Sequence, residues 1–394
     1  MTGLVTSACS GGGSSSPDSG PNAGTGGAAG HGSAGTGTGA AGSAGAVGGA
    51  GAAGSAGAVG TTGAAGTAGI TGAAGMTGAA GQGVATVGGL FTQPEPWTKD
   101  VSKLAPAARS AAILKALDTA GGWGGGRLQI DFSIPLFFAD GTTPRQTITS
   151  RAANPYCYRG TDCDPVPLQM PMPMGGNTEG SADYTCDTTK GDCHVLVVET
   201  SQHKLYELYN ATKSGAAFTA LGAFIWDLTK AYPDNLRGDQ CTSADAGGFP
   251  IGALLPTADE VAAGAVAHAL RFILPNPRMK KDVYVHPGSH AGSPESTDAN
   301  APPYGVRFRL KATFDETKFN AGERAILRAM KTYGMLLSDG GTIALTFADD
   351  RTTKAKWQSV GVTALSFSAI KVDDFDVVDL PAETALTDDC VRNP

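Results

Sequence analysis

The sequence predicts a mainly β fold: a β-sandwich or jelly-roll body with a few short helices, preceded by a disordered Gly/Ala-rich stalk. Residues 1–89 hold 31 of the 57 glycines and a single charged side chain, Asp18. The remaining residues contain many short apolar segments with strand-like alternation, joined by Pro/Gly loops. We therefore expect a residual lipoprotein signal over 1–9, a disordered linker over 10–89 and one β-rich globular domain over 90–394.

The N-terminal region has the composition of an exported protein's tether. The small residues before Cys9 resemble a bacterial lipobox, in which signal cleavage leaves a lipid-modified cysteine, although Thr6 stands at the position that is usually leucine. The alternative is an incidental exposed cysteine. Glycine then recurs at every third position from Gly48 to Gly81, but this segment contains no proline, so a flexible linker is favoured over a collagen helix.

Within the body, local patterns predict the elements in order. A helix is expected at 104–119, and the capping box formed by Asn320 and Glu323 predicts a second one at 321–333. The Pro-rich stretch 165–173 is expected to be an extended strap, and the acidic run 373–379 an edge strand with one solvated face. The other strands are expected at 128–138, 194–200, 204–211, 223–229, 265–274, 282–287 and 306–313.

Six of the seven cysteines can pair completely, which favours an oxidising compartment. Cys157 and Cys163 bracket one short loop, and Cys186 and Cys193 bracket another, which leaves Cys241 to pair with Cys390. Zinc is the alternative, but the spacings are not those of C-x₂-C sites. We therefore expect three disulfides and a secreted or cell-surface lipoprotein, at the outer membrane or outside the cell.

Composition also limits the classes of ligand and membrane attachment that we expect for this protein. The formal net charge is −7 and the sequence pI is about 5.4, with no cluster of basic residues, so a nucleic-acid ligand is not expected. No apolar run is long enough to span a bilayer, so the lipid on Cys9 is the expected membrane attachment. Nucleophile-elbow, Walker, H-E-x-x-H and Rossmann motifs are lacking. We expect a monomer.

Several segments together resemble a family of secreted bacterial (lipo)proteins of unassigned activity. They are HVLVVE at 194–199, KLYELYNA at 204–211, TSADAGGFPI at 242–251, DEVAAGAVAHALRF at 259–272, PPYGVRFRLKA at 302–312 and AILRAMKTYGMLLSDGG at 325–341. The resemblance covers most of 90–394 and implies no catalytic residues. Members of the family often carry His-Pro-Asp-Phe-Gly near the first strand, where this chain has QIDFS at 129–133, without the histidine.

The segment around TSADAGG offers candidate catalytic residues. Asp245 lies in this Gly-rich turn, and glycines let a backbone approach a ligand closely; the alternative is a turn-capping aspartate. Glu260 follows as a possible second carboxyl group. His268 is predicted in the middle of a strand, where it could position one of the carboxyls, although a satisfied core histidine is the plainer interpretation.

Other polar and aromatic residues suggest substrate binding. Carbohydrate sites combine aromatic rings that stack on pyranose faces with side chains that bind hydroxyls. The candidates for this role are Trp226, Glu207, His286, His290 and Tyr304. His286 and His290, with Asp245 or Glu260, are also a possible metal site, but a lone histidine pair is a weak signal and we expect no cofactor.

These observations favour an exported, surface-tethered enzyme that cleaves extracellular polysaccharide. A glycoside hydrolase would use Asp245 and Glu260 as its two carboxyl groups, with His268 as a positioning residue. In a lyase, His268 or Tyr304 would instead remove a proton beside a uronate carboxylate. The alternatives are a non-catalytic surface protein that binds glycans or partners, and a metal-dependent enzyme that uses His286 and His290.

Overall fold

A computed structural model of the protein describes residues 86–87, 89–151, 156–157 and 160–394. The expected signal at 1–9 and nearly all of the expected linker at 10–89 lie outside the described residues. Those that are described belong to one compact unit. Strands dominate them, so the predicted mainly β fold is confirmed.

Most strands belong to three sheets. The large sheet has six strands, in the order β1 (Ile130–Ile134), β14 (Leu345–Ala348), β10 (Leu270–Leu274), β13 (Met335–Gly340), β12 (Arg307–Leu310) and β15 (Phe375–Val378). The inner sheet has the order β2 (Leu136–Ala139), β5 (Val195–Glu199), β6 (Lys204–Tyr209) and β9 (Gly222–Asp227). The outer sheet has the order β4 (Leu168–Pro171), β3 (Arg145–Ser150), β8 (Ala217–Ala220) and β7 (Thr212–Ser214).

The remaining elements are short. A two-stranded sheet joins β11 (Val283–Tyr284) to β16 (Thr384–Ala385). The α-helices are α1 (Ser110–Thr119), α2 (Ile251–Leu254), α3 (Ala258–Ala262) and α4 (Ala321–Thr332). Single 3-10 turns occur at Pro96–Thr98, Asn276–Arg278 and Val372–Asp374.

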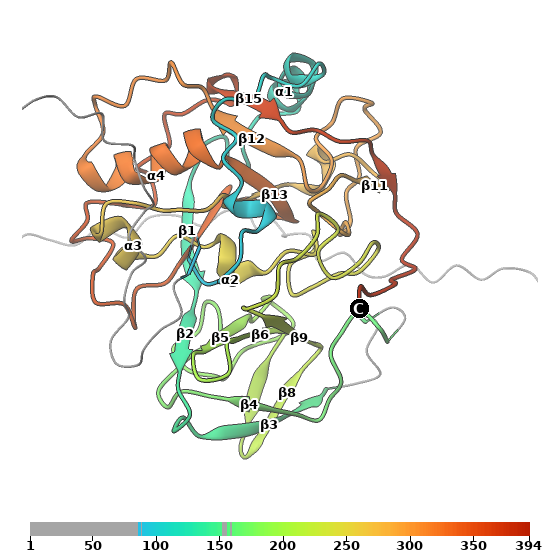
Figure 1. Ribbon diagram of the computed structural model, residues 1–394, viewed down its shortest axis with the longest axis vertical. Helices are drawn as coiled ribbons and strands as arrows, with labels where there is room; N and C mark the ends of the chain where they lie inside the picture. Colours follow the sequence, from blue (N-terminus) through green and yellow to red (C-terminus); the bar gives the residue numbers. More distant parts are fainter. Residues whose placement is uncertain (1–85, 88, 152–155, 158–159) are drawn as a thin grey trace, which may run out of the picture. The chain divides into compact units, whose positions relative to one another are not determined.

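Three apolar clusters hold these layers together. The first packs α1 and α4 on one face of the large sheet, through side chains such as Leu117, Ile326 and Phe272. The second lies between the large and inner sheets, where Leu336 and Trp226 are fully buried. The third joins the inner and outer sheets through Val197, Ile148 and Phe218. Figure 1 shows the large sheet with its helices in the upper half of the view and the two smaller sheets below. The facing four-stranded sheets are compatible with a β-sandwich.

Several predicted elements are confirmed. Strands β5, β6, β11 and β12 lie within their predicted segments, and β9 begins at Gly222, one residue before its predicted segment. Helix α4 has the expected capping box: Asn320 Oδ1 accepts from the Glu323 backbone N–H at 3.0 Å, and Glu323 Oε2 accepts from that of Asn320 at 2.9 Å. Gly334 follows this helix at φ +77°, a conformation that favours glycine. The Pro-rich stretch supplies edge strand β4, and the acidic run supplies edge strand β15.

Three segments differ from expectation. The strand predicted at 128–138 is interrupted at Pro135, because proline has no N–H to donate, and the chain passes there from the large sheet into the inner sheet. The helix predicted from 104 begins only at Ser110. The strand predicted at 265–274 begins only at Leu270, after a turn at Gly264 with φ +89°.

A candidate acid–base site around Arg271

The large sheet carries a buried cation near its centre. Arg271, on β10, is 3 % exposed. Its Nε and Nη2 donate to Asp245 Oδ1 at 3.1 and 2.9 Å, and its Nη2 also donates to Asp339 Oδ2 at 2.7 Å. Its Nη1 donates to Thr346 Oγ1 at 2.8 Å. One guanidinium therefore holds two aspartates, because a buried charged group requires hydrogen-bond partners.

Strand register explains this arrangement. Strands β1, β14, β10 and β13 are neighbours, and Asp131 on β1 pairs with Thr346 on β14. Successive strand residues face opposite sides, so Leu270 and Phe272 enter the helix-side apolar cluster while Arg271 faces the other way. Asp339 lies near the end of β13, opposite Ile273. A row of polar side chains thus crosses the face that packs toward the inner sheet.

The TSADAGG turn brings Asp245 to this row. The Ser243 hydroxyl accepts from the Asp245 N–H at 3.0 Å and donates to Phe249 O at 2.6 Å. The Gly247 N–H donates to Ser338 O on β13 at 2.7 Å. At Gly248, with φ +84°, a Cβ would lie 2.0 Å from Ser289 Oγ, so the turn needs glycine there.

Asp245 is the most strongly perturbed carboxyl of the site. Its side chain is fully buried, and Oδ2 has no hydrogen-bond partner among the described residues. Burial raises the pKa of Asp245 to about 8, despite the opposing effect of the Arg271 charge. Burial therefore favours the protonated form of Asp245.

A second ion pair adjoins the row. His194, at the entry to β5, is 2 % exposed, and its Nδ1 lies 2.7 Å from Glu179 Oε2. Its Nε2 lies 3.0 Å from Ala244 O, beside Asp245. The Ser133 hydroxyl lies 2.8 Å from Asp131 Oδ2 and 3.3 Å from Glu179 Oε1, which connects the pair to β1. We call this set the Arg271 cluster: Asp131, Ser133, Glu179, His194, Asp245, Arg271, Asp339 and Thr346.

Within the Arg271 cluster, the pKa values of two carboxyl groups that reach solvent, those of Glu179 and Asp339, are shifted in opposite directions. Burial tends to raise the pKa of Glu179, but the His194 charge and hydrogen bond outweigh it and lower that pKa to about 2. Burial tends to lower the pKa of His194, but the charge and hydrogen bond of Glu179 outweigh burial and raise that pKa to about 9. Burial raises the pKa of Asp339, although Arg271 opposes it. The side chains of Glu179 and Asp339 are 19 % and 20 % exposed.

The predicted catalytic residues fall into two separate groups. Asp245 belongs to the Arg271 cluster, whereas Glu260 Oε1 lies 3.4 Å from His268 Nε2. Glu260 Oε2 also accepts from the Thr257 backbone N–H and hydroxyl, at 2.9 and 2.8 Å, and so caps α3. No hydrogen bond or ion pair between described residues joins Asp245 to Glu260 or His268. His268 precedes β10 instead of lying in mid-strand.

The predicted substrate-binding residues are mostly internal. Trp226 and Glu207 are 0 % exposed and Tyr304 is 1 % exposed, so they have almost no surface to offer a sugar. The Trp226 Nε1–H donates to Glu207 Oε2 at 3.0 Å, and Glu207 Oε1 accepts from the Gly252 N–H at 2.9 Å. Burial raises the pKa of Glu207 to about 7.

The two loop histidines have different partners. His286 Nε2 lies 2.8 Å from Asp239 Oδ1. His290 is 2 % exposed, and its Nε2 lies 3.3 Å from Asp388 Oδ1. Within 86–87, 89–151, 156–157 and 160–394, no group of three His, Cys, Asp or Glu side chains has an arrangement that could hold a metal ion.

Sequence reasoning missed Glu179, Asp339 and the central role of Arg271. A signal was present, because an arginine between Leu270 and Phe272 in a buried strand requires a carboxylate on the same face. Asp339, at the end of the next strand in the sheet, meets that need.

The disulfides join the expected pairs: Cys157–Cys163, Cys186–Cys193 and Cys241–Cys390. The third one fixes the C-terminal tail to the segment that precedes the TSADAGG turn.

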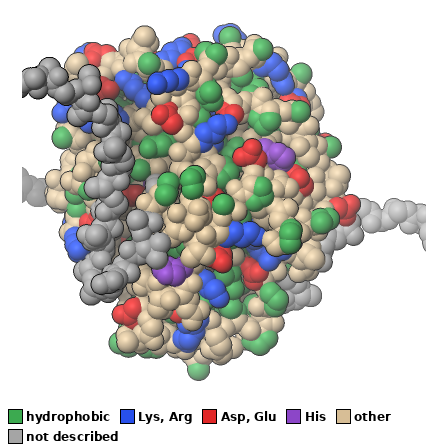
Figure 2. Space-filling model, viewed as in Figure 1, with side chains coloured by type: hydrophobic (Ala, Val, Ile, Leu, Met, Phe, Trp, Pro, Cys, Tyr) green, Lys and Arg blue, Asp and Glu red, His purple; other side chains and the backbone are tan. Residues whose placement is uncertain are grey.

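On the face shown in Figure 2, Lys and Arg side chains are interspersed with Asp and Glu. In the part of the chain that the structure describes, no helix is both long and apolar enough to cross a bilayer.

Comparisons with protein-family models, with curated proteins and with solved structures found no match to the chain.

Proposed function

We propose that the protein is an exported, surface-tethered enzyme that hydrolyses extracellular polysaccharide, with Asp339 and Glu179 as its acid and base. One observation carries the proposal: Asp339, which contacts Arg271, and Glu179, which contacts His194, are partly exposed carboxyls of one cluster, and their pKa values are displaced in opposite directions. Such a separation allows one carboxyl group to keep a proton while its neighbour stays ionised, which is the division of labour in glycoside hydrolysis.

In this mechanism Asp339 donates its proton to the glycosidic oxygen as the bond from the anomeric carbon to that oxygen breaks. Glu179, held ionised by His194, accepts a proton from the water that attacks the anomeric carbon. The sugar gains the hydroxyl of that water, and the proton count is restored when Glu179 returns a proton to solvent and Asp339 takes one up.

Asp245 acts behind these groups as a positioning residue. Its full burial keeps it from touching a substrate, but its two contacts with Arg271 orient the guanidinium that also binds Asp339. Glu260 and His268, paired at the start of α3, support the scaffold in this proposal.

Export and the sandwich architecture belong to the same proposal. Three disulfides support an oxidising compartment, and the facing inner and outer sheets support a β-sandwich. The lipid tether rests on Cys9, which lies outside the described residues.

The test is turnover by the full chain on a panel of neutral and acidic polysaccharides, with products identified by mass spectrometry. Asp339→Asn should lower kcat by about a hundredfold or more while the melting temperature changes little, because the amide keeps the shape but cannot donate the acid proton. Asp118→Asn, at an exposed position of α1, is the matched control and should retain full turnover. Equal turnover in Asp339→Asn and the control would refute the assignment.

A second candidate is a non-catalytic surface protein that binds glycans. The full burial of the contact between Asp245 and Arg271 favours it, because such a buried pair can serve structure alone. The same panel of polysaccharides separates the two functions. A binding protein is slowed in an affinity gel that contains its polysaccharide, and it releases no product from that polysaccharide.

A further inference from the structure

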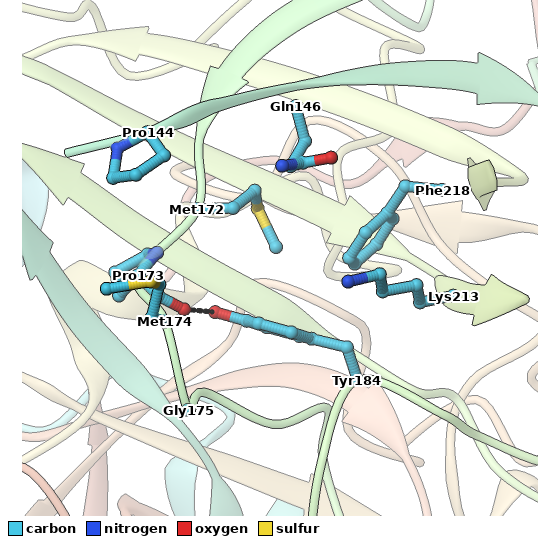
Figure 3. Close-up of a pocket in the computed structure, with 9 residues that line it drawn as sticks. All are labelled: Pro144, Gln146, Met172, Pro173, Met174, Gly175, Tyr184, Lys213 and Phe218. Carbon is cyan, nitrogen blue, oxygen red and sulfur yellow. Dashed lines mark hydrogen bonds between the residues drawn. The ribbon is translucent and has the colours of Figure 1, made fainter. Parts of the chain in front are cut away.

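A pocket outside the Arg271 cluster lies on the outer sheet. Its volume is about 350 Å³, and its lining comes from β3, β7 and β8, from the segment after β4 and from the loop that carries Tyr184. Figure 3 shows the nine lining side chains. This volume is at the lower end of the range for small-molecule pockets, roughly 300 to 1,000 Å³.

The apolar part of the pocket is preformed by contacts between its own side chains. The Tyr184 hydroxyl donates to Pro173 O at 2.8 Å, and its ring makes an edge contact with Phe218, with centroids 5.4 Å apart. A Cβ on Gly176 would lie 2.0 Å from Tyr184 Oη, so glycine leaves the room that the ring occupies. Met172 and Phe218 are buried, whereas Met174 is 88 % exposed at the rim. An exposed methionine offers a flexible apolar surface that adapts to a ligand.

The pocket also holds two uncommitted polar groups. The side chains of Lys213 and Gln146 make no hydrogen bond or ion pair with any described residue. Both extend toward the apolar lining in Figure 3, Lys213 beside Phe218. An ammonium and an amide at the mouth of an apolar pocket complement one carboxylate.

We infer that this pocket binds a small organic carboxylate with an aromatic or branched apolar body. The carboxylate would meet the Lys213 ammonium and the Gln146 amide, and the body would lie against Met172, Phe218 and Tyr184. A sugar acid fits less well, because each buried hydroxyl without a partner costs about 1–3 kcal/mol and the pocket offers only two free polar side chains. The inference does not depend on polysaccharide hydrolysis.

The test uses 3-phenylpropionate and its neutral amide in ligand-observed NMR titrations of the full chain. The acid should bind about five- to tenfold more tightly than the amide, because only the acid forms a charge-assisted contact. Lys213→Gln should remove that preference. Lys354→Gln, an exposed lysine elsewhere, should keep it. The acid's affinity should also fall as salt rises.

Three results would overturn the inference: no saturable binding of the acid, an acid-over-amide preference that survives in Lys213→Gln, or tighter binding of glucuronate than of 3-phenylpropionate. Asp339→Asn should bind the acid as the unaltered chain does. Loss of polysaccharide turnover and loss of carboxylate binding are therefore separate outcomes.

Discussion

Asp245 gives the clearest prediction at the scale of one residue. Its pKa rises from an ordinary 3.8 to about 8 on folding, so between these values the folded chain binds a proton that the unfolded chain has released. This contribution to stability is present below about pH 4 and is lost as the pH rises to about 8. Asp245→Asn does not titrate. Its melting temperature relative to that of the unaltered chain should therefore increase between about pH 5 and about pH 8. A constant or decreasing difference would show that Asp245 is ionised in the folded protein.

Single residues also mark the limit of sequence reasoning. TSADAGG identified Asp245, because glycines beside an acidic residue indicate a constrained turn. Glu179 gave no such signal. Its pKa depends on His194, which lies 15 residues later in the sequence and becomes buried only when the chain folds. Trp226 and Tyr304 are predicted to bind substrate because aromatic rings suit sugars, but both side chains are buried in the core.

At the scale of elements, the Glu260–His268 pair lies at the start of α3. Burial lowers the pKa of His268, but Glu260 outweighs this and the net effect is a raised pKa. Glu260→Gln can still cap α3 but carries no charge, so the pKa of His268 should fall in a proton NMR titration. Polysaccharide turnover should change less than twofold, since the pair lies outside the Arg271 cluster. An unchanged His268 pKa would argue against the ion pair, and a large loss of turnover would return Glu260 to the catalytic candidates.

The strands themselves were largely predictable, but their pairing was not. Alternation and short apolar runs located β5, β6, β9 and β12, most of whose residues are buried. The partners of β1 and β10, by contrast, are β14 and β13, and parallel pairs between such distant segments leave no local pattern. The switch of sheets at Pro135 brings β1 to the Arg271 cluster and β2 to the inner sheet.

At the scale of the whole molecule, the Cys241–Cys390 disulfide should stabilise most. It closes 149 residues, against 6 for Cys157–Cys163. The chain-entropy model gives about 5 kcal/mol for the long loop and about 2 kcal/mol for the short one. Replacing both cysteines of each pair by alanine should therefore lower the unfolding free energy more for the long loop, as measured by denaturant titration. A larger loss from the short loop would indicate that closure entropy does not dominate.

The most direct test of the acid–base proposal is the pH dependence of turnover in His194→Gln. His194 lowers the pKa of Glu179 to about 2, so Glu179 in the unaltered chain should stay ionised at both about pH 3.5 and about pH 6. Glutamine removes the charge, and burial then raises the pKa of Glu179 to its ordinary range or above. The account predicts that the ratio of kcat at about pH 3.5 to kcat at about pH 6 falls at least fivefold in the variant, in protein shown to be folded at both pH values. The same ratio in the variant and the unaltered chain would contradict the assignment of Glu179 as the ionised partner of Asp339.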